Sequence, residues 1–239
     1  GSRDDVNSQV TVCESYTRQL ENILKIEEES RGITPQTKLA RAKIALVRIK
    51  IESGKSVLNL EAIGIQAESA KNLLENMPAN LDLETHSLDL EIQRRTAQAK
   101  FIALMGKTPG HDPEAKLMHL IKDTTEADEI AGSLATVKQA CDKDSRLIMD
   151  SLGFCYTLDS LARLVFMTQG QSSADAVVRK GILTAINFGS PEVLARLRKL
   201  QGDMSVYGEL RNSFTDPSKW NPEVLESAIH SHEQGMAEM

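Results

Sequence analysis

The sequence predicts an all-α protein in which a long antiparallel helical hairpin or three-helix bundle is followed by a bundle of shorter helices. Three observations support this fold class. Apolar residues recur at alternating intervals of three and four, aromatic residues make up only 4% of the chain, and helix-starting motifs recur in the second half. Alternating strand patterns and Asn-Gly or Asp-Gly hairpin turns do not occur.

The first predicted helix runs from about Asp4 to Glu29. Six residues spaced by three and four share the face that we expect to be buried: Val6, Val10, Cys13, Thr17, Leu20 and Leu24. Arg31-Gly32 ends this helix, because glycine tolerates the left-handed conformation that follows a helix. Thr34 and Pro35 then cap and start the next helix, and so short a connection makes the two helices antiparallel.

The second predicted helix spans Pro35 to Asn76 without a break. Its evidence is a heptad seam of Leu39, Ala42, Leu46, Ile49, Ser53, Ser56, Leu60, Ile63, Ala67, Ala70, Leu74 and Met77. A second apolar line runs beside the seam and consists of Ile44, Val47, Ile51, Leu58 and Ile65. A helix that is apolar on two sides needs neighbours on both, so we take the second line as a candidate partner-binding surface.

Basic residues also line this helix. They begin with Lys38, Arg41 and Lys43, which lie opposite the acidic end of the first helix at Glu27, Glu28 and Glu29, and continue with Arg48, Lys50 and Lys55. They could form an anion-binding or nucleic-acid-binding patch, or they could pair with acids of the first helix. We favour pairing, because the formal net charge of the chain is −6 and the sequence has no basic tract. Nucleic acid is therefore not an expected partner.

A third helix is expected from about Leu83 to Met105, followed by a segment rich in proline and glycine at Gly106–His111. We place a domain boundary there. The sequence then predicts a long-helix antiparallel, coiled-coil-like bundle over residues 3–106 and a globular helical bundle over residues 112–234.

The second half carries three motifs in which a capping residue precedes proline and glutamate, at Asp112, Ser190 and Asn221. The expected helices cover residues 113–122, 125–152, 158–168, 174–188, 191–201, 204–214 and 222–233. The expected core residues of this half are Leu161, Leu164, Val165, Val178, Ile182 and Ile186. Trp220, the only tryptophan, lies in a turn between two helices, where it either anchors a partner or closes the end of the core.

Catalytic motifs are weak in this sequence. Ser53-Gly54-Lys55-Ser56 resembles the end of a phosphate-binding loop, but Ile49 stands where the first glycine belongs and the heptad seam continues through the motif. His230 and His232 are two residues apart, which does not suit a metal pair on a helix. Three cysteines without a CxxC spacing suggest reduced thiols. We therefore assign no catalytic residue, cofactor or metal, although a Cys–His pair formed in space stays open.

The preferred functional hypothesis is a non-enzymatic protein–protein interaction module, such as an adaptor, scaffold or regulatory subunit of a larger assembly. It would bind another protein, or a second copy of itself through the long helix. One alternative is a secretion-system component or exported effector with a helical rod. Another is an enzyme or ligand-binding bundle with its site in the C-terminal half. The sequence contains no run of 18 apolar residues, so we predict no membrane insertion. We expect a cytoplasmic protein, and secretion by a signal-less route stays open.

Overall fold

The structure is a computed structural model that describes residues 3–55, 57–106, 124–213 and 221–237. These residues are almost entirely helical and contain no strand, which confirms the all-α prediction. Contacts within the chain define two compact units. Unit 1 comprises residues 1–106 and 139–149, and unit 2 comprises residues 107–138 and 150–239.

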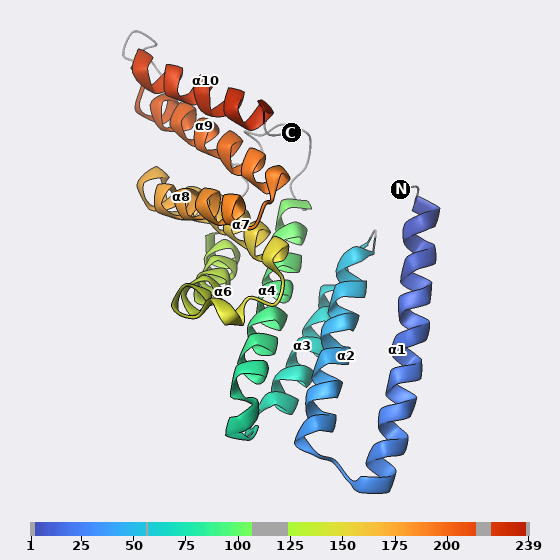
Figure 1. Cartoon of the computed structure of the whole chain (residues 1–239). Helices are drawn as coiled ribbons and strands as arrows, with labels where there is room; N and C mark the ends of the chain where they lie inside the picture. The colour runs from blue at the N-terminus through green and yellow to red at the C-terminus, as the bar shows by residue number, and fades with distance from the viewer. Residues whose placement is uncertain (1–2, 56, 107–123, 214–220, 238–239) are drawn as a thin grey trace. The chain divides into compact units, whose positions relative to one another are not determined.

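Unit 1 is an up-and-down arrangement of helices in which successive helices run in opposite directions (Figure 1). Its elements are α1 (Arg3–Arg31), α2 (Pro35–Gly54), α3 (Leu60–Leu74), the 3₁₀ turn η1 (Ala79–Leu81), α4 (Asp82–Gly106), the end of α6 (Thr124–Lys143) and the 3₁₀ turn η2 (Ser145–Leu147). Helix α2 packs against α1, α3 and α4, whereas α1 lies at the edge of the unit, beside α2 (Figure 1).

The connection between α1 and α2 is built as its sequence predicts. Gly32 has φ +79° and donates its backbone N–H to the carbonyl of Glu28. The Thr34 hydroxyl accepts from the backbone N–H of Thr37, and the Thr37 hydroxyl accepts from the backbone N–H of Thr34. This reciprocal pair satisfies two donors at the start of α2 and fixes the reversal of the chain.

The predicted single helix over Pro35–Asn76 is wrong, because the chain turns back after Gly54. Lys55 is extended with ψ 150°, and the Asn59 side chain caps α3 by accepting from the backbone N–H of Ala62 at 3.0 Å. Glycine weakens a helix and the asparagine offers a new start, so the helix ends where its propensity is lowest.

The heptad seam survives this turn because both halves face one core. The buried members of that core are Leu39, Ala42, Ala45, Leu46 and Ile49 from α2, Ile63, Ala70 and Leu74 from α3, and Leu88, Ile92 and Ala99 from α4. An antiparallel pair of helices can therefore carry the same spacing as one long helix. The apolar pattern predicts which side of a helix is buried. The turn determines the helix against which that side packs.

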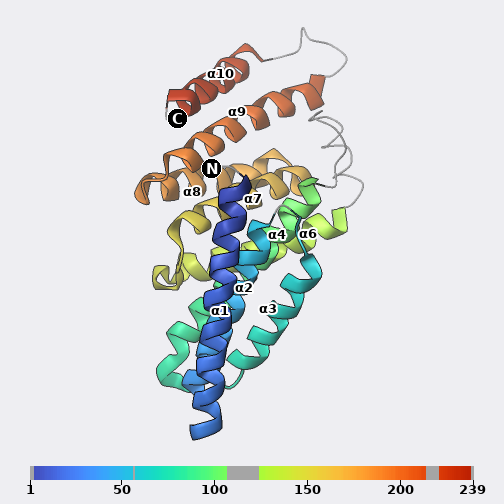
Figure 2. The same cartoon turned by 90° about the vertical axis from the view of Figure 1, so that its right-hand side faces the viewer.

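Unit 2 contains the beginning of α6 and four further helices, α7 (Ser151–Gln169), α8 (Gln171–Asn187), α9 (Pro191–Ser213) and α10 (Pro222–Ala237). Asp150 caps α7 by accepting from the backbone N–H of Gly153 at 2.8 Å. Gly170, with φ +89°, is the single residue between α7 and α8. Helices α9 and α10 lie side by side (Figure 2).

Several boundaries in the second half differ from those predicted. The predicted helix over 125–152 ends at Lys143, and α7 begins seven residues before the predicted start at 158. The two helices predicted over 191–201 and 204–214 form one helix, α9. The predicted helix over 113–122 lies outside the described residues.

The predicted core of the second half is confirmed at five positions out of six. Leu161, Leu164, Val165, Val178 and Ile182 are buried, whereas Ile186 is 52% exposed. Ile186 lies eight residues after Val178, and that spacing brings it to the edge of the buried stripe of α8.

Candidate interaction surface

Helix α1 is held to α2 by a ladder of three ion pairs. Glu28 pairs with Arg41, Glu21 with Arg48 at 2.5 Å, and Glu14 with Lys55 at 3.3 Å. Each step of the ladder is seven residues in both helices, in opposite directions, as two antiparallel helices require. The prediction that the basic face of α2 pairs with acids of the first helix is confirmed for these three residues, whereas Lys43 and Lys50 pair with Glu84 and Glu91 of α4.

The ion pairs of the ladder shift the pKa values of three of its members. The side-chain hydrogen bond from Arg41 lowers the pKa of Glu28, and the same bond raises the pKa of Arg41. The hydrogen bond to Glu52, followed by the bond to Glu14, raises the pKa of Lys55. All of these shifts keep the groups charged near neutral pH, so the ladder persists there.

The side of α1 that faces α2 is more polar than predicted. The inward positions are Val10, Glu14, Thr17, Glu21, Leu24 and Glu28, and only Thr17 is buried. The predicted face included Cys13 and Leu20, which are exposed. The helix is rotated so that its glutamates meet the basic residues of α2, a contact that a purely apolar criterion does not anticipate.

The opposite side of α1 is apolar and bare. Five large side chains there are between 51% and 66% exposed, namely Val12, Tyr16, Leu20, Ile23 and Ile26. We call these five residues the outer seam. Apart from Leu20, they follow the heptad spacing 12, 16, 19, 23 and 26, with Gln19 as the polar member. A heptad spacing with no neighbour is typical of a helix that binds another helix.

The candidate partner-binding residues of the long helix are placed differently from one another. Ile44 and Ile51 are buried, and Leu58 is partly buried against the core. Val47 and Ile65 are 40% and 60% exposed. Ile51 lines the same groove as Glu14 and Thr17 of α1, so part of the second apolar line is covered by α1. Trp220 lies outside the described residues.

Sequence reasoning missed the outer seam, although a signal was present. The positions 12, 16, 19, 23 and 26 have the same alternating intervals as the inward positions, shifted by two residues along the chain. A helix with two such seams can bury only one of them against a single neighbour. The seam that faces α2 is the one whose glutamates pair with the basic residues of α2.

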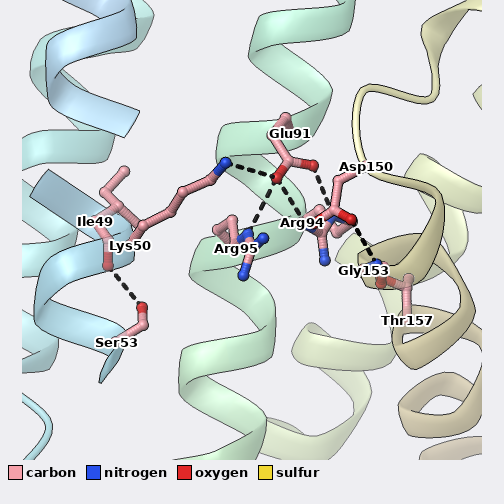
Figure 3. A network of polar contacts seen from close by, with 9 residues as sticks. All are labelled: Ile49, Lys50, Ser53, Glu91, Arg94, Arg95, Asp150, Gly153 and Thr157. Atoms are coloured by element: carbon pink, nitrogen blue, oxygen red, sulfur yellow. Dashed lines mark hydrogen bonds and ion pairs between the residues drawn. The ribbon is translucent and has the colours of Figure 1, made fainter. Parts of the chain in front are cut away.

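Unit 1 contains a buried polar network on α4 (Figure 3). The Glu91 carboxylate accepts from both Nε and Nη2 of Arg94, at 2.7 and 2.6 Å, and from Nε of Arg95 at 3.0 Å. Lys50 of α2 approaches the same carboxylate at 3.9 Å. Glu91 and Arg94 are 5% and 3% exposed, so this is a buried bidentate pair.

Unit 2 has a comparable network around Asp159 of α7, which is 1% exposed. Arg163 of the same helix and Arg196 of α9 both bind its carboxylate at 3.1 Å. Arg196 also lies 5.4 Å from the ring centre of Tyr156, whose hydroxyl donates to Glu192. These contacts tie α7 to α9 and leave the carboxylate enclosed by protein groups.

Two of the three cysteines are buried. All three are free, Cys13 is exposed, and Cys141 and Cys155 are buried. Burial, followed by the nearby Asp142 carboxylate, raises the pKa of Cys141 to about 11, and burial also raises the pKa of Cys155. Both buried thiols are therefore protonated near neutral pH, and a protonated thiol is a weak nucleophile.

A thiol-specific reagent should distinguish these cysteines. We expect the native protein to react with Ellman's reagent quickly at one thiol, Cys13, and at least about 100-fold more slowly at the other two, because they react only when the fold opens. The Cys13→Ser variant should lose the fast phase, and all three thiols should react in denaturant. Two fast phases in the native protein would contradict the burial of Cys141 and Cys155.

Motifs for other chemistry gain no support from the described part of the chain. Lys55 belongs to the segment that resembles the end of a phosphate-binding loop. It follows a helix rather than a strand, and it binds Glu52 and Glu14. Of the two arguments against this motif, the missing glycine at Ile49 stands, whereas the unbroken helix is wrong because α2 ends at Gly54. Within the described residues, no cluster of three His, Cys, Asp or Glu side chains could hold a metal ion, and no helix is long and apolar enough to cross a membrane.

Comparison of the chain with protein-family models, with curated proteins and with solved structures finds no match. The class of protein that the described residues define is thus a two-unit helical protein with an unpartnered apolar helix face.

Proposed function

We propose that the protein is a non-enzymatic protein–protein interaction module that docks through the outer seam of α1. One observation carries the proposal: five large apolar side chains, four of them in heptad spacing, lie exposed on a helix whose opposite side is already bound. Exposed apolar surface of this kind is costly in water and is typical of binding sites. An adaptor, a scaffold or a regulatory subunit would use such a face.

The polar clusters support this assignment over an enzymatic one. The buried carboxylates of Glu91 and Asp159 are bound by arginines of their own units, at distances of 2.6 to 3.1 Å. Carboxylates held in this way contribute to packing and are not open to a substrate. Free cysteines suit a reducing compartment, so we place the protein in the cytoplasm.

The test is a pull-down from the source cell with the wild-type chain and with Ile23→Asp. Ile23 lies near the middle of the outer seam and is 60% exposed, so the substitution leaves the fold intact. We expect a stoichiometric protein retained by the wild type to be lost, because a charge at the centre of an apolar interface weakens binding about 100-fold or more.

Val57→Asp is the matched control, since Val57 is exposed in the connection between α2 and α3, outside the outer seam. This variant should retain the protein that the wild type retains. If Ile23→Asp retains it equally well, the outer seam is not the docking surface.

A further inference from the structure

The outer seam is flanked by uncharged residues over most of its length. Ser15 and Asn22 border it on one side, and Cys13 borders it on the other, beside Leu20 of the outer seam itself. These are the positions at which charged residues normally select or reject the partner of a heptad helix. A partner with the same uncharged flanks would meet no repulsion here, and the same helix in a second copy of the chain has such flanks.

The two ends of the outer seam are alike in their apolar content. Val12 and Tyr16 lie at one end, Ile23 and Ile26 at the other, and the polar Gln19 lies between them. Turning a second copy end over end therefore places apolar side chains on apolar side chains and brings Gln19 near its own copy. A surface that matches itself after a two-fold rotation is the requirement for an isologous dimer.

Charge selects the orientation. Glu27 and Glu29 lie near the C-terminal end of the outer seam, and a parallel pair would bring the acids of both copies together. Their ion pairs with Arg31 and Lys25 are exposed and 3.7 and 3.9 Å long, so they offset this repulsion only in part. An antiparallel pair lays each acidic end along the uncharged residues 11–13 of the other copy.

From these observations we infer that the outer seam binds the outer seam of a second copy, with the two α1 helices antiparallel. The inference rests on the proposed function and names the occupant of the same surface. A single pair of helices buries less than the roughly 800 Å² per partner of a standard interface, so the dimer forms in a concentration-dependent manner.

Sedimentation of the full-length chain over a concentration series tests the dimer. We expect a monomer–dimer equilibrium whose dissociation constant rises about 100-fold in Ile23→Asp and also rises in Ile26→Gln, but does not change in Val57→Asp. Circular dichroism establishes that each variant keeps its helix content. A wild type that stays monomeric at every concentration, or a dimer that Ile23→Asp leaves unchanged, would overturn the inference.

Cross-linking with a short bismaleimide tests the orientation. In an antiparallel pair, two Cys13 residues lie about 20 Å apart, because each is about six residues from the seam centre at 1.5 Å per residue. The native chain should therefore not cross-link through Cys13, whereas Leu20→Cys in a Cys13→Ser background should. Efficient cross-linking through Cys13 would show a parallel pair and overturn the stated arrangement.

The two experiments separate this inference from the proposed function. A different protein that the wild-type chain retains and Ile23→Asp loses, together with a wild-type chain that remains monomeric, would reject the second copy as occupant and keep the interaction module. Dimers that depend on Ile23 support both. If neither dimerisation nor partner retention depends on Ile23, both fail.

Discussion

Replacing Glu91 by alanine is expected to lower the free energy of unfolding by about 3–5 kcal/mol, the usual cost of breaking a buried ion pair by removing one partner. The Glu91 carboxylate accepts three hydrogen bonds from Arg94 and Arg95, and Arg94 is 3% exposed. The substitution removes a carboxylate that accepts two hydrogen bonds from a buried guanidinium (Figure 3). Chemical denaturation followed by circular dichroism measures the effect.

The matched control is Glu84→Ala on the same helix. Glu84 pairs with Lys43, but both side chains are nearly half exposed, so this change should cost no more than about 1 kcal/mol. Arg94→Ala and the double variant complete a cycle in which the double variant loses less stability than the sum of the single variants. Equal losses for Glu91→Ala and Glu84→Ala would show that burial adds nothing to this pair.

Two glycines show why some helix boundaries are predicted incorrectly from the sequence. The apolar seam continues past Gly54 and predicts a helix through it, yet the helix ends there. The sequence predicts Gly202 in a gap between two helices, yet it lies inside α9. A Cβ atom at Gly202 would lie 2.9 Å from the carbonyl oxygen of Ala228 in α10, so this glycine permits a close approach of two helices.

Local sequence does not distinguish these two uses of glycine. Both positions have low helix propensity, and the outcome depends on whether a neighbouring backbone comes close or a new cap follows. Buried sides of helices were easier to predict, because the apolar period persists whichever helix supplies the contact. The apolar spacing does not predict the candidate surface, since the outer and inner seams of α1 have the same spacing and differ in the glutamates that face the basic residues of α2.

Inverting the charges of α2 in the ladder is expected to release α1 from unit 1. The triple variant Arg41→Glu, Arg48→Glu and Lys55→Glu sets three acids against Glu28, Glu21 and Glu14. Among the inward positions from Val10 to Glu28, Thr17 alone is buried, so little apolar contact there opposes the repulsion. Hydrogen exchange across α1 should become about 10- to 100-fold faster while α2, α3 and α4 stay protected.

The reciprocal triple variant of α1, with lysine at positions 14, 21 and 28, should release α1 to the same extent. Combining the two triple variants restores attraction at every step of the ladder, because each pair is reversed as a whole. The combined variant should therefore recover most of the protection of the wild type. High salt should weaken the docking of α1 in the wild type and in the combined variant. If α1 stays protected in both triple variants, apolar contacts with α2 hold it; if the combined variant does not recover, the opposed pairs of the ladder do not set the register of α1.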